Sequence, residues 1–171
     1  MKPQVSVIMG STSDLPVMEA ALNFLEAQQI PFEVNALSAH RTPHQVLQFA
    51  AEAAGRGIKV IIAAAGGAAH LPGVIAAATP LPVIGVPIKA SISMDGWDSM
   101  LSMIQMPPGI PVATVGLNAA QNAAILAMQI LAVADPEVAT KVVEYKVSLG
   151  KKIEKANSEL AQLKMWKYKT N

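Results

Sequence analysis

The feature that most constrains the fold is a regular alternation of short β-branched runs with longer stretches of helix length. Each longer stretch must return the chain across a sheet, which makes successive strands parallel and their connections right-handed. We expect strands at 5–9, 32–37, 59–63, 83–86 and 112–115, and helices at 15–28, 43–56, 71–78, 95–105 and 118–133.

This pattern predicts an α/β fold, namely a single-domain three-layer sandwich on a doubly wound, flavodoxin-like parallel sheet. A chain of 171 residues suits one domain. We expect residues 1–134 to form its α/β body and residues 135–171 a helical extension of the same domain. The stretch 118–133 is nearly all small or apolar, so we expect that helix to be buried on all sides.

The stretch 60–88 carries no Asp, Glu, Lys or Arg and is long enough to be mistaken for a membrane span. Four prolines and the pair Gly66–Gly67 break it into short pieces, which favours buried strands over a membrane helix. The N-terminus lacks the apolar region of a signal peptide, and the chain has no cysteine. We therefore expect a soluble protein without a membrane partner, and the lack of cysteine is compatible with a reducing cytoplasm.

In open parallel sheets, ligands bind beyond the carboxyl ends of the strands, so the loop after each strand is a candidate site. The first loop is GSTSD (10–14), where Ser11, Ser13 and Asp14 precede an expected helix. Hydroxyls and backbone N–H groups at a helix N-terminus suit a phosphate. Plain helix capping by Ser13 or Asp14 explains the same residues equally well.

The second loop is SAHRTP (38–43), in which we expect Thr42 to be the N-cap of a helix and Pro43 its first residue. Arg41 offers a planar, permanently charged group for a second contact with a phosphate. His40 is a candidate general acid and base because imidazole exchanges protons near neutral pH. A purely structural histidine is the alternative.

The third loop lies in AAAGGAAHLPG (63–73). Gly66 and Gly67 permit close backbone approach and positive φ, so main-chain N–H groups there could meet a carboxylate. Tight packing of a helix on the sheet would use the same glycines. His70 stands just before a second expected helix start. With three histidines and no cysteine in the chain, a zinc site is not expected.

Beyond residue 135, apolar residues recur at steps of three or four over a length that one small domain cannot cover. This stripe predicts a long C-terminal helix that packs on another subunit, hence a homo-oligomer. Residues 141–171 hold eight basic and three acidic side chains, which would also suit nucleic acid. We favour a solvated or subunit-docking helix face and expect no nucleic-acid partner. The stripe comprises Val138, Val142, Tyr145, Leu149, Ile153, Ala156, Leu160 and Leu163.

Five segments together closely resemble the bacterial, class I N(5)-carboxyaminoimidazole ribonucleotide mutase family of de novo purine synthesis. The resemblance covers about residues 5–133, and SAHRTP with GGAAHLPG is its most specific pair. The segments are VIMGSTSD (7–14), SAHRTP (38–43), AGGAAHLPG (65–73), PVIGVP (82–87) and MPPGIPVATV (106–115).

The resemblance implies an isomerase of IMP biosynthesis that moves a carboxylate from the exocyclic nitrogen of a ribonucleotide substrate to ring carbon 4. The product is 4-carboxy-5-aminoimidazole ribonucleotide. In the family, the carbamate loses CO2 in a closed site, the CO2 recombines at carbon 4, and a histidine shuttles the proton. No metal or organic cofactor is implied, and the family is typically octameric and cytoplasmic.

The resemblance also assigns roles to residues. His40 matches the proton shuttle, and His70, the second candidate catalytic residue, belongs to the loop around the migrating carboxylate. Asp14 matches the position that binds the ribose hydroxyls. The phosphate positions are matched by Ser11, Ser13, Ser38 and Arg41, and the rest of the carboxylate loop by Gly66, Gly67, Ala68 and Leu71.

Three other functions stay open at this stage. A flavodoxin-like FMN carrier would use a similar first loop but needs aromatic side chains beside the flavin, and aromatics are only 4% of this chain. A non-catalytic phosphosugar-binding subunit would keep Ser11, Asp14 and Arg41 without needing His40. A carboxylase of the same family would combine free CO2 with aminoimidazole ribonucleotide.

Overall fold

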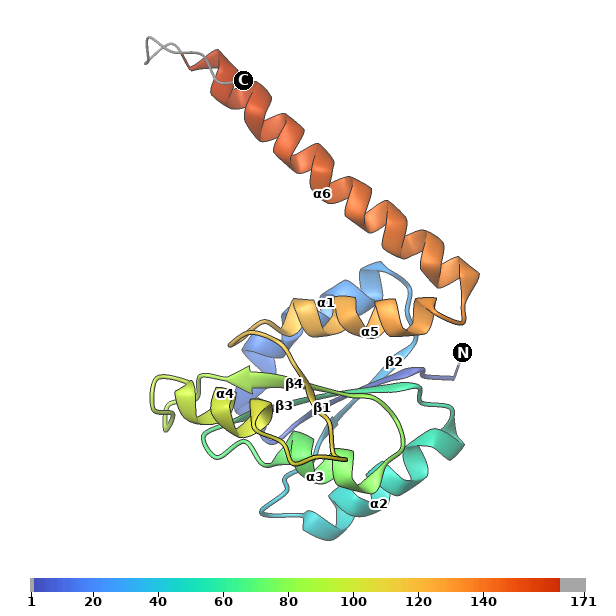
Figure 1. Cartoon of the computed structure of the whole chain (residues 1–171), viewed down its shortest axis with the longest axis vertical. Helices are drawn as coiled ribbons and strands as arrows, with labels where there is room; N and C mark the ends of the chain where they lie inside the picture. Colours follow the sequence, from blue (N-terminus) through green and yellow to red (C-terminus); the bar gives the residue numbers. More distant parts are fainter. Residues whose placement is uncertain (1, 164–171) are drawn as a thin grey trace. The chain divides into compact units, whose positions relative to one another are not determined.

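The computed structural model describes residues 2–163 and contains one parallel sheet of five strands (Figure 1). The strand order β2-β1-β3-β4-β5 confirms the doubly wound, flavodoxin-like sheet. The order reverses between β1 and β3, which is where ligands bind in such sheets. The strands are β1 (Val5–Met9), β2 (Phe32–Ala36), β3 (Val60–Gly66), β4 (Val83–Ile88) and β5 (Ala113–Thr114).

Helices cover both faces of the sheet, as expected from the alternating pattern. Helices α1 and α5 lie on one face, and α2 and α3 lie on the other (Figure 1). Met103 of α4 belongs to the same buried cluster as Val46 of α2 and Ile75 of α3. The helices of this layered part are α1 (Leu15–Ala27), α2 (Pro43–Arg56), α3 (Leu71–Ala78), α4 (Trp97–Ile104) and α5 (Ala120–Ala132).

The middle of the sheet is buried on both sides, because β1 and β4 are buried along their whole length and β3 up to its last residue. Ser6 is the polar exception in β1, and its Oγ donates a hydrogen bond of 2.9 Å to Oε1 of Glu33. The guanidinium of Arg56 donates two more to the same carboxylate, at 2.8 and 2.9 Å. Burial raises the pKa of Glu33, but the bonds from Arg56 and Ser6 and the charge of Arg56 prevail and lower it.

Several element bounds expected from the sequence differ from the structure by one to three residues, and two other expectations differ as well. Strand β3 continues through Gly66 instead of ending at residue 63, because its pairing with β4 extends to Gly66 opposite Ile88. Helix α5 is not buried on all sides, since Gln121 and Asn122 are exposed. Thr42 precedes α2 but does not cap it with its side chain, because Oγ1 bonds to the backbone of Ser38 instead.

The chain divides into two compact units after Leu131. The second unit contains α6 (Pro136–Gln162), which is the predicted long C-terminal helix. Asp135 starts this helix, and its carboxylate accepts hydrogen bonds from the backbone N–H groups of Glu137 and Val138 at 3.0 and 3.2 Å. Several stripe residues are exposed, including Leu149, Ile153 and Leu160.

Two expectations about the C-terminal part are left open by this arrangement. The packing of α6 on another subunit and the assignment of residues 135–171 to the same domain stay predictions. Residues 164–171 of the basic tail lie outside the described residues. Within residues 2–163, no helix is both long and apolar enough to span a membrane.

Candidate active site

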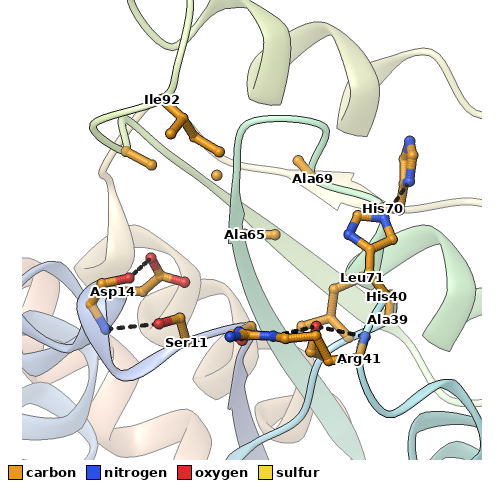
Figure 2. Close-up of a pocket in the computed structure, with 15 residues that line it drawn as sticks. Ser11, Asp14, Ala39, His40, Arg41, Ala65, Ala69, His70, Leu71 and Ile92 are labelled. Carbon is orange, nitrogen blue, oxygen red and sulfur yellow. Dashed lines mark hydrogen bonds between the residues drawn. The ribbon is translucent and has the colours of Figure 1, made fainter.

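A cavity of about 320 Å³ opens where the loops after the first four strands meet (Figure 2). It lies at the carboxyl ends of β1 and β3, the point where the strand order reverses. Most of the site residues predicted from sequence line it, namely Ser11, Ser13, Asp14, Ser38, His40, Arg41, Gly66, His70 and Leu71.

The loop after β1 forms one wall. Ser11 begins the short 3-10 helix η1 (Thr12–Asp14), and its Oγ accepts a bond of 3.3 Å from the N–H of Ser13. The hydroxyl of Ser13 donates to Oδ1 of Asp14 at 3.4 Å. Asp14 is only 5% exposed, and this burial raises its pKa although the bonds from Ser13 and from the Ser11 backbone oppose the shift. A buried carboxylate beside a cavity is a ready acceptor for ligand hydroxyl groups.

The loop after β2 places the guanidinium of Arg41 next to the loop after β1. Nη2 of Arg41 donates a hydrogen bond of 2.7 Å to the carbonyl oxygen of Gly10 in the first loop. Nε of Arg41 donates to Oγ of Ser38 at 3.3 Å, and the backbone N–H of Arg41 bonds to the same oxygen at 3.2 Å. The guanidinium is therefore held beside two strand ends, where an anion would also meet the N-terminus of α1.

The loop after β3 is a tight turn. A Cβ on Gly66 would lie 2.7 Å from Cβ of Ala90 and 3.1 Å from the carbonyl oxygen of Ile88, so this position needs glycine for close approach. Gly67 has a φ of 61°, and Ala69 also has a positive φ, of 49°. Oγ of Ser102 in α4 donates a bond of 2.8 Å to the carbonyl oxygen of Ala68 and braces the turn.

The two histidines predicted for the site contact each other. Nε2 of His40 lies 2.8 Å from Nδ1 of His70, and the ring planes meet at 87° with their centroids 5.0 Å apart. Figure 2 shows both rings at one side of the pocket. Residues 30 positions apart in sequence thus form one pair of proton-exchanging groups.

The sequence model of the AIR carboxylase family matches residues 4–152 of this chain. The chain belongs to the AIR carboxylase family. It is 51% identical to the N5-carboxyaminoimidazole ribonucleotide mutase of Pyrococcus horikoshii, over 98% of this chain and 94% of that protein. It is 54% identical to the phosphoribosylaminoimidazole carboxylase of Candida glabrata, over 95% of this chain but 28% of that longer protein.

A solved structure supports the same assignment. The crystal structure of PurE from Treponema denticola is similar to this chain with a TM-score of 0.83 and 31% identity. The match covers 94% of this chain and 99% of that one. The family resemblance predicted from the sequence motifs is therefore confirmed.

Two of the residues assigned from the family motifs lie outside the lining of the cavity. The N–H of Gly67 donates to Oγ of Ser93 at 3.3 Å, and the carbonyl of Ala68 is bonded to Ser102. In this member of the AIR carboxylase family, these two residues therefore shape the turn. Their contact with a carboxylate stays a prediction.

Sequence reasoning missed part of the lining. Ala90 and Ile92 come from the loop after β4, and Ile92 is 81% exposed at the rim. The rule that ligands lie beyond strand ends could have found this loop, but neither residue type carries a chemical signal. The lining also includes Gly10, Ala39, Ala65 and Ala69, none of which was assigned a role from the sequence. In the described part of this AIR carboxylase family chain, no group of three or more His, Cys, Asp or Glu could hold a metal ion.

Proposed function

We propose that this chain is an N(5)-carboxyaminoimidazole ribonucleotide mutase, an isomerase of purine biosynthesis. The 51% identity to a protein of that name, over 98% of this chain, supports the reaction. The observation that carries the proposal is the loop after β2. In this loop Arg41 bonds to Ser38 and to Gly10 of the first loop, which supports a phosphate site there, and His40 lies between Ser38 and Arg41 in sequence and lines the same cavity.

The substrate's phosphate binds between the first two loops. Arg41 supplies positive charge, the hydroxyls of Ser11, Ser13 and Ser38 supply hydrogen bonds, and the start of α1 adds its dipole. Asp14 accepts hydrogen bonds from the ribose. These contacts fix the distance from the phosphate to the imidazole ring, and so place the reacting carbon beside His40.

The reaction breaks one N–C bond and forms one C–C bond. The carbamate loses CO2, and His40 in its protonated form gives a proton to the exocyclic nitrogen. Carbon 4 of the ring then attacks the CO2, and His40 takes up the proton that carbon 4 loses. The histidine ends the cycle as it began, so no external acid, base or oxidant is consumed.

The cavity suits a trapped CO2. Ala65, Ala69, Leu71, Ala90 and Ile92 contribute apolar side chains to the lining that also holds the two histidines. An apolar surround limits the water that could carry CO2 away before it recombines. We assign the contact with the migrating carboxylate to the turn at residues 66–68, which requires the N–H of Gly67 to exchange its bond to Oγ of Ser93 for one to the ligand.

The assembly we propose is a cytoplasmic homo-oligomer, an octamer by resemblance to the family, without a nucleic-acid partner. Large apolar side chains are exposed on α4, where Trp97 is 66% and Leu101 58% exposed. On α6, Val143 is 62% and Ile153 64% exposed. Apolar surfaces of this kind are typical of contacts between subunits.

A carboxylase that uses free CO2 and aminoimidazole ribonucleotide is the second candidate. The 54% identity to a fungal phosphoribosylaminoimidazole carboxylase favours it, because this chain is about as similar to that carboxylase as it is to the mutase of Pyrococcus horikoshii. The deciding experiment supplies the purified protein with each substrate at low bicarbonate. We expect conversion of the N(5)-carboxy substrate independent of bicarbonate. Conversion of aminoimidazole ribonucleotide alone, rising with bicarbonate, would favour the carboxylase.

The same preparation separates the enzyme from the two non-enzymatic alternatives. An FMN carrier would be purified yellow, whereas we expect a colourless protein. A phosphosugar-binding subunit would bind the nucleotide without converting it, so absence of turnover with retained binding would contradict the mutase proposal.

A further inference from the structure

We infer that His70 is a positioning residue for His40. It accepts a hydrogen bond from Nε2–H of His40 and thereby fixes the tautomer in which Nδ1 of His40 exchanges the proton with the substrate. This inference rests on the proposed function, in which His40 moves a proton, and it assigns that step to one ring nitrogen.

The contact itself limits the number of protons on the pair. A distance of 2.8 Å between Nε2 of His40 and Nδ1 of His70 requires one hydrogen between the two atoms. Two imidazolium rings would place two hydrogens there, so both rings cannot be charged while the contact holds. With Nε2 engaged, Nδ1 is the nitrogen of His40 left for the substrate.

The proposed reaction requires His40 to donate the hydrogen bond that joins the two rings, with His70 accepting it. As a base, His40 needs a lone pair at Nδ1, so its own hydrogen must be on Nε2 and point to His70. As an acid, His40 carries hydrogen on both nitrogens and still donates through Nε2. The bond to His70 therefore persists through both proton transfers, and only Nδ1 changes its state. A neighbour that orients a catalytic histidine through its second nitrogen is the arrangement found in catalytic triads.

His70 can act as the acceptor without a second protein partner. Its side chain is exposed and also borders a second cavity of about 260 Å³, lined by Gly73, Val74, Ser102 and Met106. With Nδ1 accepting, the hydrogen of His70 resides on Nε2, where water can accept it.

The backbone holds His70 in place at a local energetic cost. Ala69 adopts a φ of 49°, a left-handed conformation that is disfavoured for a residue with a Cβ. Bonds from Ala69 N–H to the Gly66 carbonyl and from Val74 N–H to the His70 carbonyl fix both sides of the turn. Strain that persists beside a pocket is typical of functional positions. Here it directs His70 toward the second loop.

Two substitutions separate the hydrogen bond from the shape of the ring. His70→Asn loses the ring but places an amide oxygen near the position of Nδ1, whereas His70→Phe keeps the ring and loses the acceptor. We expect kcat to stay within about threefold of wild type for His70→Asn. For His70→Phe we expect a loss of roughly 10- to 100-fold at nearly unchanged KM, as when the partner of a functional histidine is removed. The reverse order of the two variants would overturn the inference.

A spectroscopic measurement tests the same point without turnover. The chain has three histidines, so ¹⁵N-histidine labelling gives a simple spectrum in which exposed His44 is an internal reference. At mildly alkaline pH we expect His40 to be the Nε2–H tautomer in wild type and His70→Asn, and a mixture in His70→Phe. An unchanged His40 tautomer in His70→Phe would overturn the inference. A protein with the fixed tautomer but no mutase turnover would instead refute the proposed function alone.

Discussion

Nη2 of Arg41 donates a hydrogen bond of 2.7 Å to the carbonyl oxygen of Gly10, which joins the loop after β2 to the loop after β1. The two loops lie side by side because β1 and β2 are neighbours in the sheet. The arginine is thus oriented before any ligand arrives, so less side-chain entropy is lost on binding.

Substitution of Arg41 tests the proposed contact of its guanidinium with the phosphate. Arg41→Lys keeps the charge but loses the planar fork and the Nε bond to Ser38, so binding should weaken by about 1–3 kcal/mol. Calorimetry with aminoimidazole ribonucleotide, which has the phosphate but no carboxylate to transfer, measures the change. Arg56→Lys is the matched control, because Arg56 pairs with Glu33 outside the cavity. Equal affinities of wild type and Arg41→Lys would place the phosphate elsewhere.

Substitution of His40 tests the proton shuttle. His40→Asn keeps a hydrogen-bonding side chain but cannot carry a proton, so turnover should fall by roughly 10²–10⁴-fold while nucleotide binding persists. His70→Asn should have a smaller effect, and His44→Asn, exposed on α2, should have none. Single-turnover assays beside binding measurements decide this. Near-normal turnover of His40→Asn with an inactive His70→Asn would reverse the two assignments.

Asp14 should reduce stability at neutral pH. Its pKa is higher in the folded chain than the ordinary value of 3.8, so stability falls as pH rises through that value toward the folded pKa. Asp14→Asn removes the buried charge and should raise the urea midpoint at neutral pH. That gain should vanish below about pH 3.8, where the carboxyl is protonated in both states.

Exposed Glu19 offers a control for this measurement, because Glu19→Gln removes the same charge from the surface of α1. A midpoint for Asp14→Asn at or below that of wild type at neutral pH would show that the carboxylate is stabilised by contacts beyond those from Ser13 and Ser11. The substitution should also weaken nucleotide binding if Asp14 bonds the ribose.

Gly66 should not tolerate a side chain. In Gly66→Ala the new Cβ would meet Ala90 and the Ile88 backbone, and overpacking of this kind destabilises by about 1–3 kcal/mol. Gly55→Ala in α2 is the control, since its added Cβ would meet nothing within 4 Å apart from its chain neighbours and the helix's own backbone, and it should stabilise by about 0.4–1 kcal/mol. Chemical denaturation measures both. Wild-type stability of Gly66→Ala would show that the loop after β4 moves away at little cost.

The exposed apolar residues of α6 should hold an assembly together. Truncation after Asp135 should give smaller assemblies or insoluble protein, as measured by light scattering. The double substitution Val147→Glu and Ile153→Glu is a milder test, because both side chains are more than half exposed and need no repacking within the chain. A full-length chain that is a monodisperse monomer would contradict this prediction.

The sequence motifs by themselves indicated which polar and ionisable side chains belong to the candidate site. Ser11, Arg41 and His40 could be singled out because each follows an apolar run and precedes a helix start, and the chain order of strands and helices is local information. The ranges of α2 and α3 were predicted to the residue, since Pro43 and Pro72 mark helix starts and Gly57 and Thr79 follow the ends. Local signals of this kind act within a few residues.

Tertiary structure alone decided which loops meet. The strand order with its reversal between β1 and β3 brings the loops carrying His40 and His70 together, and no local pattern encodes the resulting 2.8 Å contact. The same holds for the extension of β3 to Gly66, which depends on pairing with β4, and for Ile92 at the rim. Sequence determines what each segment can form by itself. Contacts between segments distant in the chain depend on how the whole sheet packs, because burial and strand pairing are shared among all of them.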